Sequence, residues 1–220
     1  MSRLAVFDCD GTLVDSQAAI VAIMAQAFCA EGLPAPVDVE VRRTIGLPLL
    51  NAVALLAPAA EEAAHRRLTQ AYRDIARSVQ HADGHHEPLY DGAQATLDRL
   101  GAGGWLLAVA TGKGRRGLIA TLTRHGLLDR FLSLHTADDG PGKPDPAMLH
   151  SAMAAAGVDA ASTVMIGDTS FDMRMAVNAG TRGIGVGWGY HPAGELLAAG
   201  AETVVATYVD LGDLLLGGRR

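Results

Sequence analysis

The sequence is poor in cysteine and has no long apolar segment, and these two absences exclude whole classes of protein. Only Cys9 and Cys29 occur among the 220 residues, too few for a framework of disulfide bonds, so we expect a reducing compartment, the cytoplasm. No run approaches the roughly 18 consecutive apolar residues that a membrane-spanning helix needs, and no secretory signal pattern is present. We therefore expect no membrane partner.

Concentrated positive charge is also lacking. The chain has 18 lysine and arginine residues against 24 aspartate and glutamate residues, a formal net charge of -6, and its basic residues gather only in short pairs. Because proteins bind nucleic-acid phosphates through clustered lysine and arginine, neither DNA nor RNA is an expected partner. The sequence does not indicate an oligomeric state.

A regular alternation of short apolar runs and helical patterns fills the second half of the chain. We expect strands at residues 4–7, 106–110, 131–134, 163–166 and 183–186, helices at residues 92–100, 117–125, 146–156 and 171–179, and a last strand and helix within 204–216. Strands separated by helices of this length form parallel sheets through right-handed crossovers. The chain, 49% hydrophobic, is therefore expected to fold as an α/β protein with a doubly wound, Rossmann-like parallel sheet.

An all-helical segment interrupts this alternation after the first strand. Residues 17–31 have apolar side chains at the helical period, and residues 36–80 are rich in helix-forming residues, with breaks at glycine and proline. The polar residues 81–88 precede the return to strands and helices. We predict a core of residues 1–14 and 86–220 and an inserted helical cap of residues 15–85.

Polar side chains stand at the ends of three of the expected strands. They are Asp8 and Asp10 after the first strand, Thr111 and Gly112 after the run 106–110, and Asp168 and Asp172 after residues 163–166. Ligands collect outside the carboxyl ends of the strands in open parallel sheets. We therefore expect these segments to meet in one pocket.

Four carboxylates in one pocket require compensating positive charge. Each pair at about 4 Å costs roughly 4 kcal/mol at an effective dielectric constant near 20. An all-oxygen ligand set suits Mg²⁺, and the absence of a Cys or His pair in these segments disfavours zinc. Lys143, between Gly142 and Pro144, adds a second cation on a backbone biased to an extended form.

The same groups fit the transfer of a phosphoryl group. Thr111 and the amide of Gly112 offer hydrogen-bond donors at the start of a helix, where phosphate binds well. A phosphate, a metal, a fixed lysine and a carboxylate nucleophile together describe transfer through an aspartyl-phosphate. We expect Asp8 to attack the phosphorus, and Asp10 to protonate the leaving oxygen and then to deprotonate the hydrolytic water.

Four segments, in order, resemble the four motifs of the haloacid-dehalogenase superfamily. They are DCDGTLVDS at residues 8–16, ATG at 110–112, GKPDP at 142–146 and GDTSFD at 167–172. The resemblance spans essentially the whole chain, including a helical cap inserted directly after the first motif. Residues 185–192 are similar to the phosphoglycolate-phosphatase-like branch of this superfamily.

The resemblance implies a role for each acidic residue of these motifs. Asp8 would be the nucleophile and a Mg²⁺ ligand, and Asp10 the acid–base residue that also gives its carbonyl oxygen to the metal. Asp168 would be a further metal ligand. Asp172 would orient Lys143 or a metal-bound water.

The resemblance also implies a phosphate site. Thr111, the amide of Gly112 and Lys143 would hold the phosphate, together with the segment of Cys9 and Asp10. We expect Cys9 to contribute its backbone amide and not a reactive thiol, because no base is evident beside it. In related caps a loop closes over the substrate, so Arg43, which precedes Gly46, is a candidate specificity residue.

The function predicted from these residues is a Mg²⁺-dependent phosphatase for a small phosphomonoester, with phosphoglycolate as the family-level suggestion. Relatives that cleave carbon–halogen or phosphonate bonds lack an aspartate at the position of Asp10, so its presence favours phosphate esters. A phosphomutase of the β-phosphoglucomutase type is an alternative that would share the same core. A phospho-accepting or ligand-binding regulatory protein is a non-enzymatic alternative, although receiver domains are much shorter and have no helical insertion.

Overall fold

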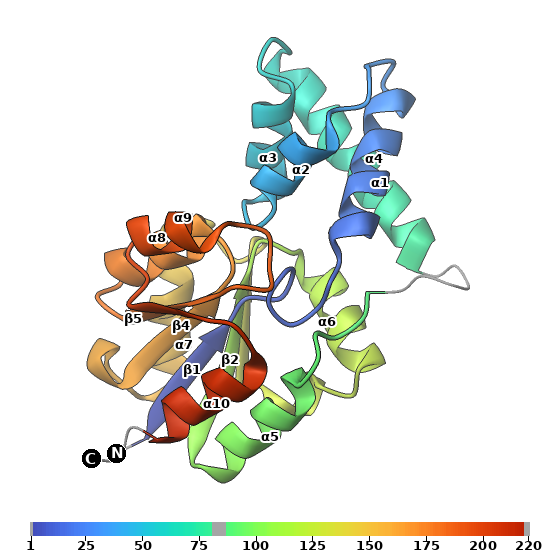
Figure 1. The fold of residues 1–220 in the computed structure, drawn as a ribbon. Coiled ribbons are helices and arrows are strands. Elements are labelled where there is room, and N and C mark those ends of the chain that lie inside the picture. The colour runs from blue at the N-terminus through green and yellow to red at the C-terminus, as the bar shows by residue number, and fades with distance from the viewer. Residues whose placement is uncertain (1, 81–86, 218–220) are drawn as a thin grey trace.

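The structure of the protein is a computed structural model that describes residues 2–80 and 87–217 (Figure 1). Its centre is one sheet of six parallel strands in the order β3-β2-β1-β4-β5-β6. The strands are β1 (Arg3–Phe7), β2 (Trp105–Thr111), β3 (Ser133–Thr136), β4 (Thr163–Gly167), β5 (Arg182–Val186) and β6 (Thr203–Val205). The order runs outward in both directions from β1 and β4, which makes their carboxyl ends the switch point where ligands bind in such sheets. The predicted doubly wound α/β fold is confirmed.

Helices cover both faces of the sheet, and the alternation of side chains along β1 explains why. Ala5 and Phe7 pack with one group of helices, α5 (Ala93–Ala102), α6 (Arg115–Arg124) and α10 (Tyr208–Gly217). Leu4 and Val6 point the other way and pack against α7 (Ala147–Ala156) and α8 (Ser170–Asn178). Because successive side chains of a strand face opposite sides, a strand buried on both faces is apolar throughout, as the run 4–7 is.

The helices between β1 and β2 form a group of their own. Figure 1 shows α1 (Gln17–Ala30), α2 (Asp38–Thr44), α3 (Leu49–Leu56) and α4 (Glu62–Gln80) together beyond the end of the sheet. Their apolar faces meet in a separate cluster that includes Met24, Phe28, Val53 and Leu68. A segment with its own small core is consistent with an inserted cap.

The chain leaves the core and returns to it at neighbouring points. Val14 and Leu89 form an isolated β-bridge, and the amide of Asp15 donates to the carbonyl oxygen of Pro88 at 2.8 Å. The return boundary predicted at residues 85 and 86 lies outside the described residues. The division into core and cap therefore stays a prediction.

Sequence periodicity missed one helix and two 3-10 turns of the core and gave approximate ends for other elements. The structure has a short helix α9 (Ala193–Ala198), and 3-10 turns η1 (Leu128–Arg130) and η2 (Ala160–Ser162), where no element was expected. A helix of one and a half turns is too short to give a reliable apolar period.

Within the described residues, no helix combines the length and the apolar character needed to cross a membrane.

Candidate active site

The site is built at the ends of two neighbouring strands. The ladder between β1 and β4 pairs Phe7 with Ile166, and the amide of Asp8 extends it by donating to the carbonyl oxygen of Ile166 at 2.9 Å. Asp168 follows directly after β4. This register brings together two carboxylates that are far apart in the sequence, as parallel pairing predicted.

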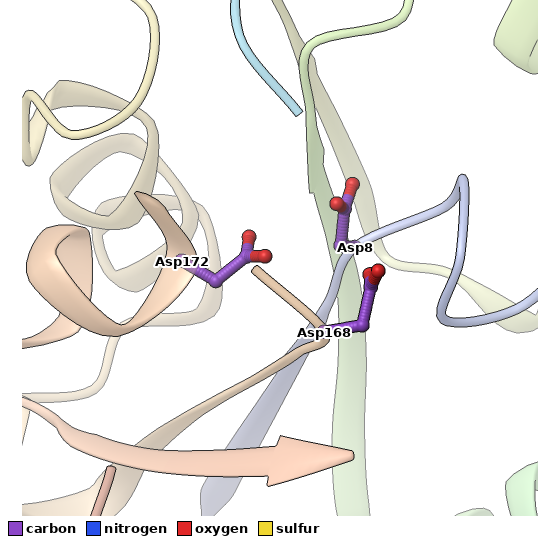
Figure 2. A group of neighbouring side chains, drawn as sticks. All are labelled: Asp8, Asp168 and Asp172. Carbon is purple, nitrogen blue, oxygen red and sulfur yellow. The ribbon is translucent and has the colours of Figure 1, made fainter. Parts of the chain in front are cut away.

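Asp172 completes a group of three buried carboxylates. Oxygen atoms of Asp8, Asp168 and Asp172 lie within 4.8 Å of one another. Figure 2 shows that Asp8 and Asp168 point the same way from adjacent strand ends while Asp172 points toward them from the start of α8. The residue before α8, Thr169, holds Asp172 in a capping box, because its amide and hydroxyl both donate to Asp172 Oδ2, at 3.0 and 2.7 Å. The other carboxylate oxygen of Asp172 is thereby left for the site.

Lys143 lies among these carboxylates and is itself buried, with 1% of its surface exposed. Its Nζ is 2.8 Å from Asp8 Oδ2 and 2.6 Å from Asp172 Oδ1. Burial lowers the pKa of Lys143, but the charges of Asp172 and Asp8 outweigh it and hold the pKa above its usual value. Lys143 is therefore a fixed cation that contacts two of the three carboxylates.

One lysine does not neutralise three carboxylates. Burial raises the pKa of Asp8 to about 7 against the lowering influence of Lys143. Burial, with the charges of Asp8 and Asp172, also raises the pKa of Asp168 well above its usual value. A hard divalent cation among these oxygen ligands would favour the charged forms, so the residues present fit a metal such as Mg²⁺.

Asp168 is held in place by hydrogen bonds from two loops. The hydroxyl of Thr12 donates to Oδ1 at 2.8 Å, and the backbone amide of Tyr190 donates to Oδ2 at 2.9 Å. Gly11 has a φ of +83°, and a Cβ built there would lie 2.2 Å from Asp168 Oδ2. Glycine at residue 11 therefore allows the loop after β1 to approach the carboxylate closely.

Asp10 stands apart from this group and has its own partners. The hydroxyl of Ser16 and the Nζ of Lys113 both donate to Asp10 Oδ1, at 2.6 and 2.7 Å. Lys113 Nζ also lies 3.4 Å from Glu87 Oε1. Burial lowers the pKa of Lys113, but the charges of Asp10 and Glu87 hold the pKa well above its usual value. The carboxylate of Asp10 is thus fixed near the three carboxylates without joining them.

Sequence reasoning assigned no catalytic role to Lys113, Ser16 or Glu87. Serine directly before a predicted helix is typical of a helix cap, and Ser16 does occupy the residue before α1, but its hydroxyl makes no capping bond there and donates to Asp10 instead. One signal could have identified Lys113. The chain contains only two lysines, Lys113 and Lys143, and each directly follows a glycine of a predicted motif, Gly112 or Gly142. No comparable signal marks Glu87.

The expected phosphate-binding groups lie beside Asp8. Thr111 ends β2 with 1% of its surface exposed, and its hydroxyl accepts a hydrogen bond from the amide of Lys113 at 3.2 Å. The amide of Cys9 donates to Asp8 Oδ1 at 2.6 Å. Burial raises the pKa of the Cys9 thiol well above its usual value, which opposes formation of a thiolate.

A cavity of about 640 Å³ lies between the carboxyl ends of the strands and the helices α1–α4 (Figure 1). Asp8, Asp10, Thr111 and Lys113 line it from the side of the sheet. From the other side it is lined by parts of α1, the segment 44–52 and α4. The loop that precedes α3 lies directly over β2, because a Cβ built at Gly112 would be 2.7 Å from the carbonyl oxygens of Gly46 and Leu47.

Arg43, the candidate specificity residue, is not among the residues that line this cavity. Its side chain is 71% exposed, and its guanidinium lies 3.9 Å from Glu195 Oε1 of α9. The side chain of Arg43 thus lies at the surface beside α9, and its role in specificity stays a prediction.

The chain is similar to curated phosphatases over nearly its whole length. It is 36% identical to the probable phosphatase IndB of Dickeya dadantii (strain 3937), over 96% of this chain and 92% of that protein. It is 32% identical to a phosphoglycolate phosphatase of Rhodospirillum rubrum, over 98% of this chain and 91% of that one. A phosphoglycolate phosphatase of Vibrio vulnificus (strain CMCP6) is 28% identical, over 97% of this chain and 96% of the relative.

Solved structures agree with this similarity. The crystal structure of a predicted phosphatase from Clostridium acetobutylicum superimposes with a TM-score of 0.87 at 25% identity, over 98% of both chains. A hydrolase from Pseudomonas syringae gives a TM-score of 0.87 at 27% identity, over 99% of this chain and 100% of the other. The model of the haloacid dehalogenase-like hydrolase family matches residues 5–186. The chain therefore belongs to the haloacid dehalogenase-like hydrolase family and is a phosphatase.

Proposed function

We propose that this phosphatase hydrolyses a phosphomonoester of the phosphoglycolate kind, in two steps, through a phosphoryl group carried on Asp8, with Mg²⁺ as its cofactor. The observation that carries the proposal is the contact of Asp8 Oδ2 with Lys143 within the group of three buried carboxylates, with Asp10 fixed nearby. The phosphoglycolate phosphatases among the similar proteins support the choice of substrate class.

Asp8 and Asp168 would hold the metal with their carboxylates, and Asp10 with its backbone carbonyl oxygen. When bound, Mg²⁺ supplies positive charge that offsets the negative charge of the phosphoryl oxygens and of the attacking carboxylate. Asp172 would act through Lys143, since its Oδ1 fixes the ammonium group 2.8 Å from the nucleophile. Lys143 would thus contact both the phosphate and Asp8.

In the first step a carboxylate oxygen of Asp8 attacks the phosphorus, and the bond from phosphorus to the ester oxygen breaks. Thr111 and the backbone amides of Cys9 and Gly112 would bind the phosphoryl oxygens. Asp10 would give its proton to the leaving oxygen, which departs as an alcohol.

In the second step Asp10 takes a proton from water, and this water attacks the phosphorus of the phosphorylated Asp8. The bond from phosphorus to the carboxylate breaks, which frees inorganic phosphate and restores Asp8. Ser16 and Lys113 would keep the carboxylate of Asp10 oriented through both steps. The predicted cap of residues 15–85 would exclude bulk water during the chemistry and open to release the products.

The experiment is release of inorganic phosphate from a panel of phosphomonoesters that includes phosphoglycolate, with Mg²⁺ and with EDTA. The proposal expects steady phosphate release that EDTA abolishes and Mg²⁺ restores, and that Asp8→Asn abolishes. Phosphate release unchanged in Asp8→Asn contradicts it. An isomerised sugar phosphate formed much faster than free phosphate would indicate the mutase alternative instead.

A further inference from the structure

The cavity at the site is larger than the smallest phosphate esters require. At about 640 Å³ it falls within the range of about 300–1,000 Å³ that is typical of pockets for drug-sized molecules. Phosphoglycolate, in which a single carbon separates the ester oxygen from the carboxylate, would fill only a small part of it. The remaining volume of the cavity would accommodate a larger leaving group.

One part of the lining is apolar and belongs to the cap. Ile20, Ile23 and Met24 of α1 line the cavity, and so do Leu47 in the loop before α3 and Leu49 at its start. Ile23 and Met24 are themselves buried. Side chains of this kind stabilise an apolar group of a ligand by removing it from water.

Another part of the lining carries two arginines that have no partner in the part of the chain that the structure describes. Arg73 of α4 and Arg116 of α6 both line the cavity. Within residues 2–80 and 87–217, neither guanidinium has a hydrogen bond or an ion pair, whereas on α4 Arg66 pairs with Glu62 and Arg67 with Glu31. The neighbour of Arg116 on α6, Arg115, likewise pairs with Asp139.

The charges around these two arginines sum to a positive value. Apart from Asp8 and the linked group of Asp10, Lys113 and Glu87, the charged side chains of the lining are Arg73, Arg77, Arg116 and Asp138. Asp138 Oδ2 accepts a hydrogen bond from the backbone amide of Arg115, the first residue of α6. Arg77 pairs with Asp74. An anion that enters this part of the cavity therefore meets two exposed guanidinium groups that have no partner among residues 2–80 and 87–217.

From these observations we infer that the leaving group of the substrate has an apolar body and, at a distance from the phosphate, a carboxylate or another acidic group that binds Arg73 and Arg116. The apolar body lies against α1 and the start of α3. This inference rests on the proposed phosphatase reaction at Asp8 and names the substrate class of that site: a phosphorylated acid larger than phosphoglycolate. Arg73 and Arg116 come from the cap and the core, so the acidic group also holds the two together.

The test is a binding measurement that does not need turnover. Calorimetry in Mg²⁺ compares 4-phosphonobenzoate with phenylphosphonate, two phosphonates that differ only in the carboxylate. The inference expects 4-phosphonobenzoate to bind about tenfold more tightly at low salt, since a tenfold gain corresponds to about 1.4 kcal/mol, within what two exposed charge pairs together contribute. This ratio should fall severalfold in Arg73→Gln and in Arg116→Gln, and also at high salt.

Arg66→Gln is the matched control, because Arg66 lies on the same helix as Arg73 but does not line the cavity. Its binding ratio should equal that of the unaltered protein. Equal affinity for the two phosphonates, or a ratio that Arg73→Gln and Arg116→Gln both leave unchanged, overturns the inference. Hydrolysis of 4-carboxyphenyl phosphate, assayed in parallel, tests the proposed function separately: a binding preference that depends on Arg73 without any phosphate release sustains this inference and contradicts the reaction.

Discussion

Lys113 Nζ lies 2.7 Å from Asp10 Oδ1, so one lysine of this chain holds the proposed acid–base residue while the other, Lys143, holds the proposed nucleophile. The chain has no other lysine, and the remainder of its fixed positive charge is arginine. A lysine offers a compact ammonium group that can contact two carboxylates at once, as Lys113 does with Asp10 and Glu87. The arrangement predicts a distinct role for each lysine.

Replacing Lys113 by methionine should lower kcat by about tenfold to a hundredfold, because acid–base catalysis contributes a factor of about 10²–10⁴ and depends on the position of Asp10. The loss should be smaller for 4-nitrophenyl phosphate than for an alkyl phosphate, since the nitrophenolate leaves without a proton. The difference should appear in kcat/KM, which reports the first step, whereas the second step is the same for both esters; phosphate release at low substrate concentration checks this. Lys113→Arg retains the charge and should lose less. Equal losses in kcat/KM for the two esters would contradict a role of Lys113 through Asp10 in the first step.

Replacing Gly112 by alanine should lower kcat/KM by about tenfold or more, because displacement of bound groups by about 1 Å can cost up to a hundredfold. The new Cβ would lie 2.7 Å from the carbonyl oxygens of Gly46 and Leu47, so the cap loop must shift away from the site. Steady-state kinetics measure the effect. Gly101→Ala, in α5 with no atom within 4 Å of the new Cβ, is the control and should leave the kinetics unchanged; similar kinetics for both variants would contradict a closed loop over Gly112.

Mg²⁺ should stabilise the metal-free protein against unfolding. The expected gain is about 2.7 kcal/mol when the free metal exceeds its dissociation constant a hundredfold, because the ion binds the folded carboxylate group and not the unfolded chain. Thermal unfolding with increasing Mg²⁺ gives this gain as a rising midpoint. Asp168→Asn should remove it, and Asp129→Asn, at an exposed residue, should not. A midpoint that rises equally in all three proteins would exclude Asp168 as a ligand.

Much of the site could be predicted because it follows from local sequence and parallel pairing. The apolar run before Asp8 predicts β1, the run before Asp168 predicts β4, and the pairing of Phe7 with Ile166 then brings the two carboxylates together. Asp172 follows as the third helical residue after Thr169, where a capping box fixes it.

Other contacts could not be predicted, because they join segments whose relative position depends on the whole fold. Lys113 and Asp10 are 103 residues apart, and Glu87 lies in a polar stretch with no periodic pattern. Ser16 had a plausible local role as a helix cap, and only the position of Asp10 shows that its hydroxyl is used elsewhere. Arg73 and Arg43 both lie on cap helices, and the packing of those helices decides which of them faces the cavity.

The most direct test of the account is to locate the phosphoryl group on the enzyme. In Asp10→Asn the second step lacks its base, while the first step still proceeds with a substrate such as acetyl phosphate whose leaving group needs no proton. Rapid acid quench, proteolysis and mass spectrometry should then find a phosphoryl group on the peptide that contains Asp8, and Asp8→Asn should carry none. Phosphate found on another residue, or steady hydrolysis by the unaltered enzyme with no phosphorylated Asp8 at any time, would contradict the central claim.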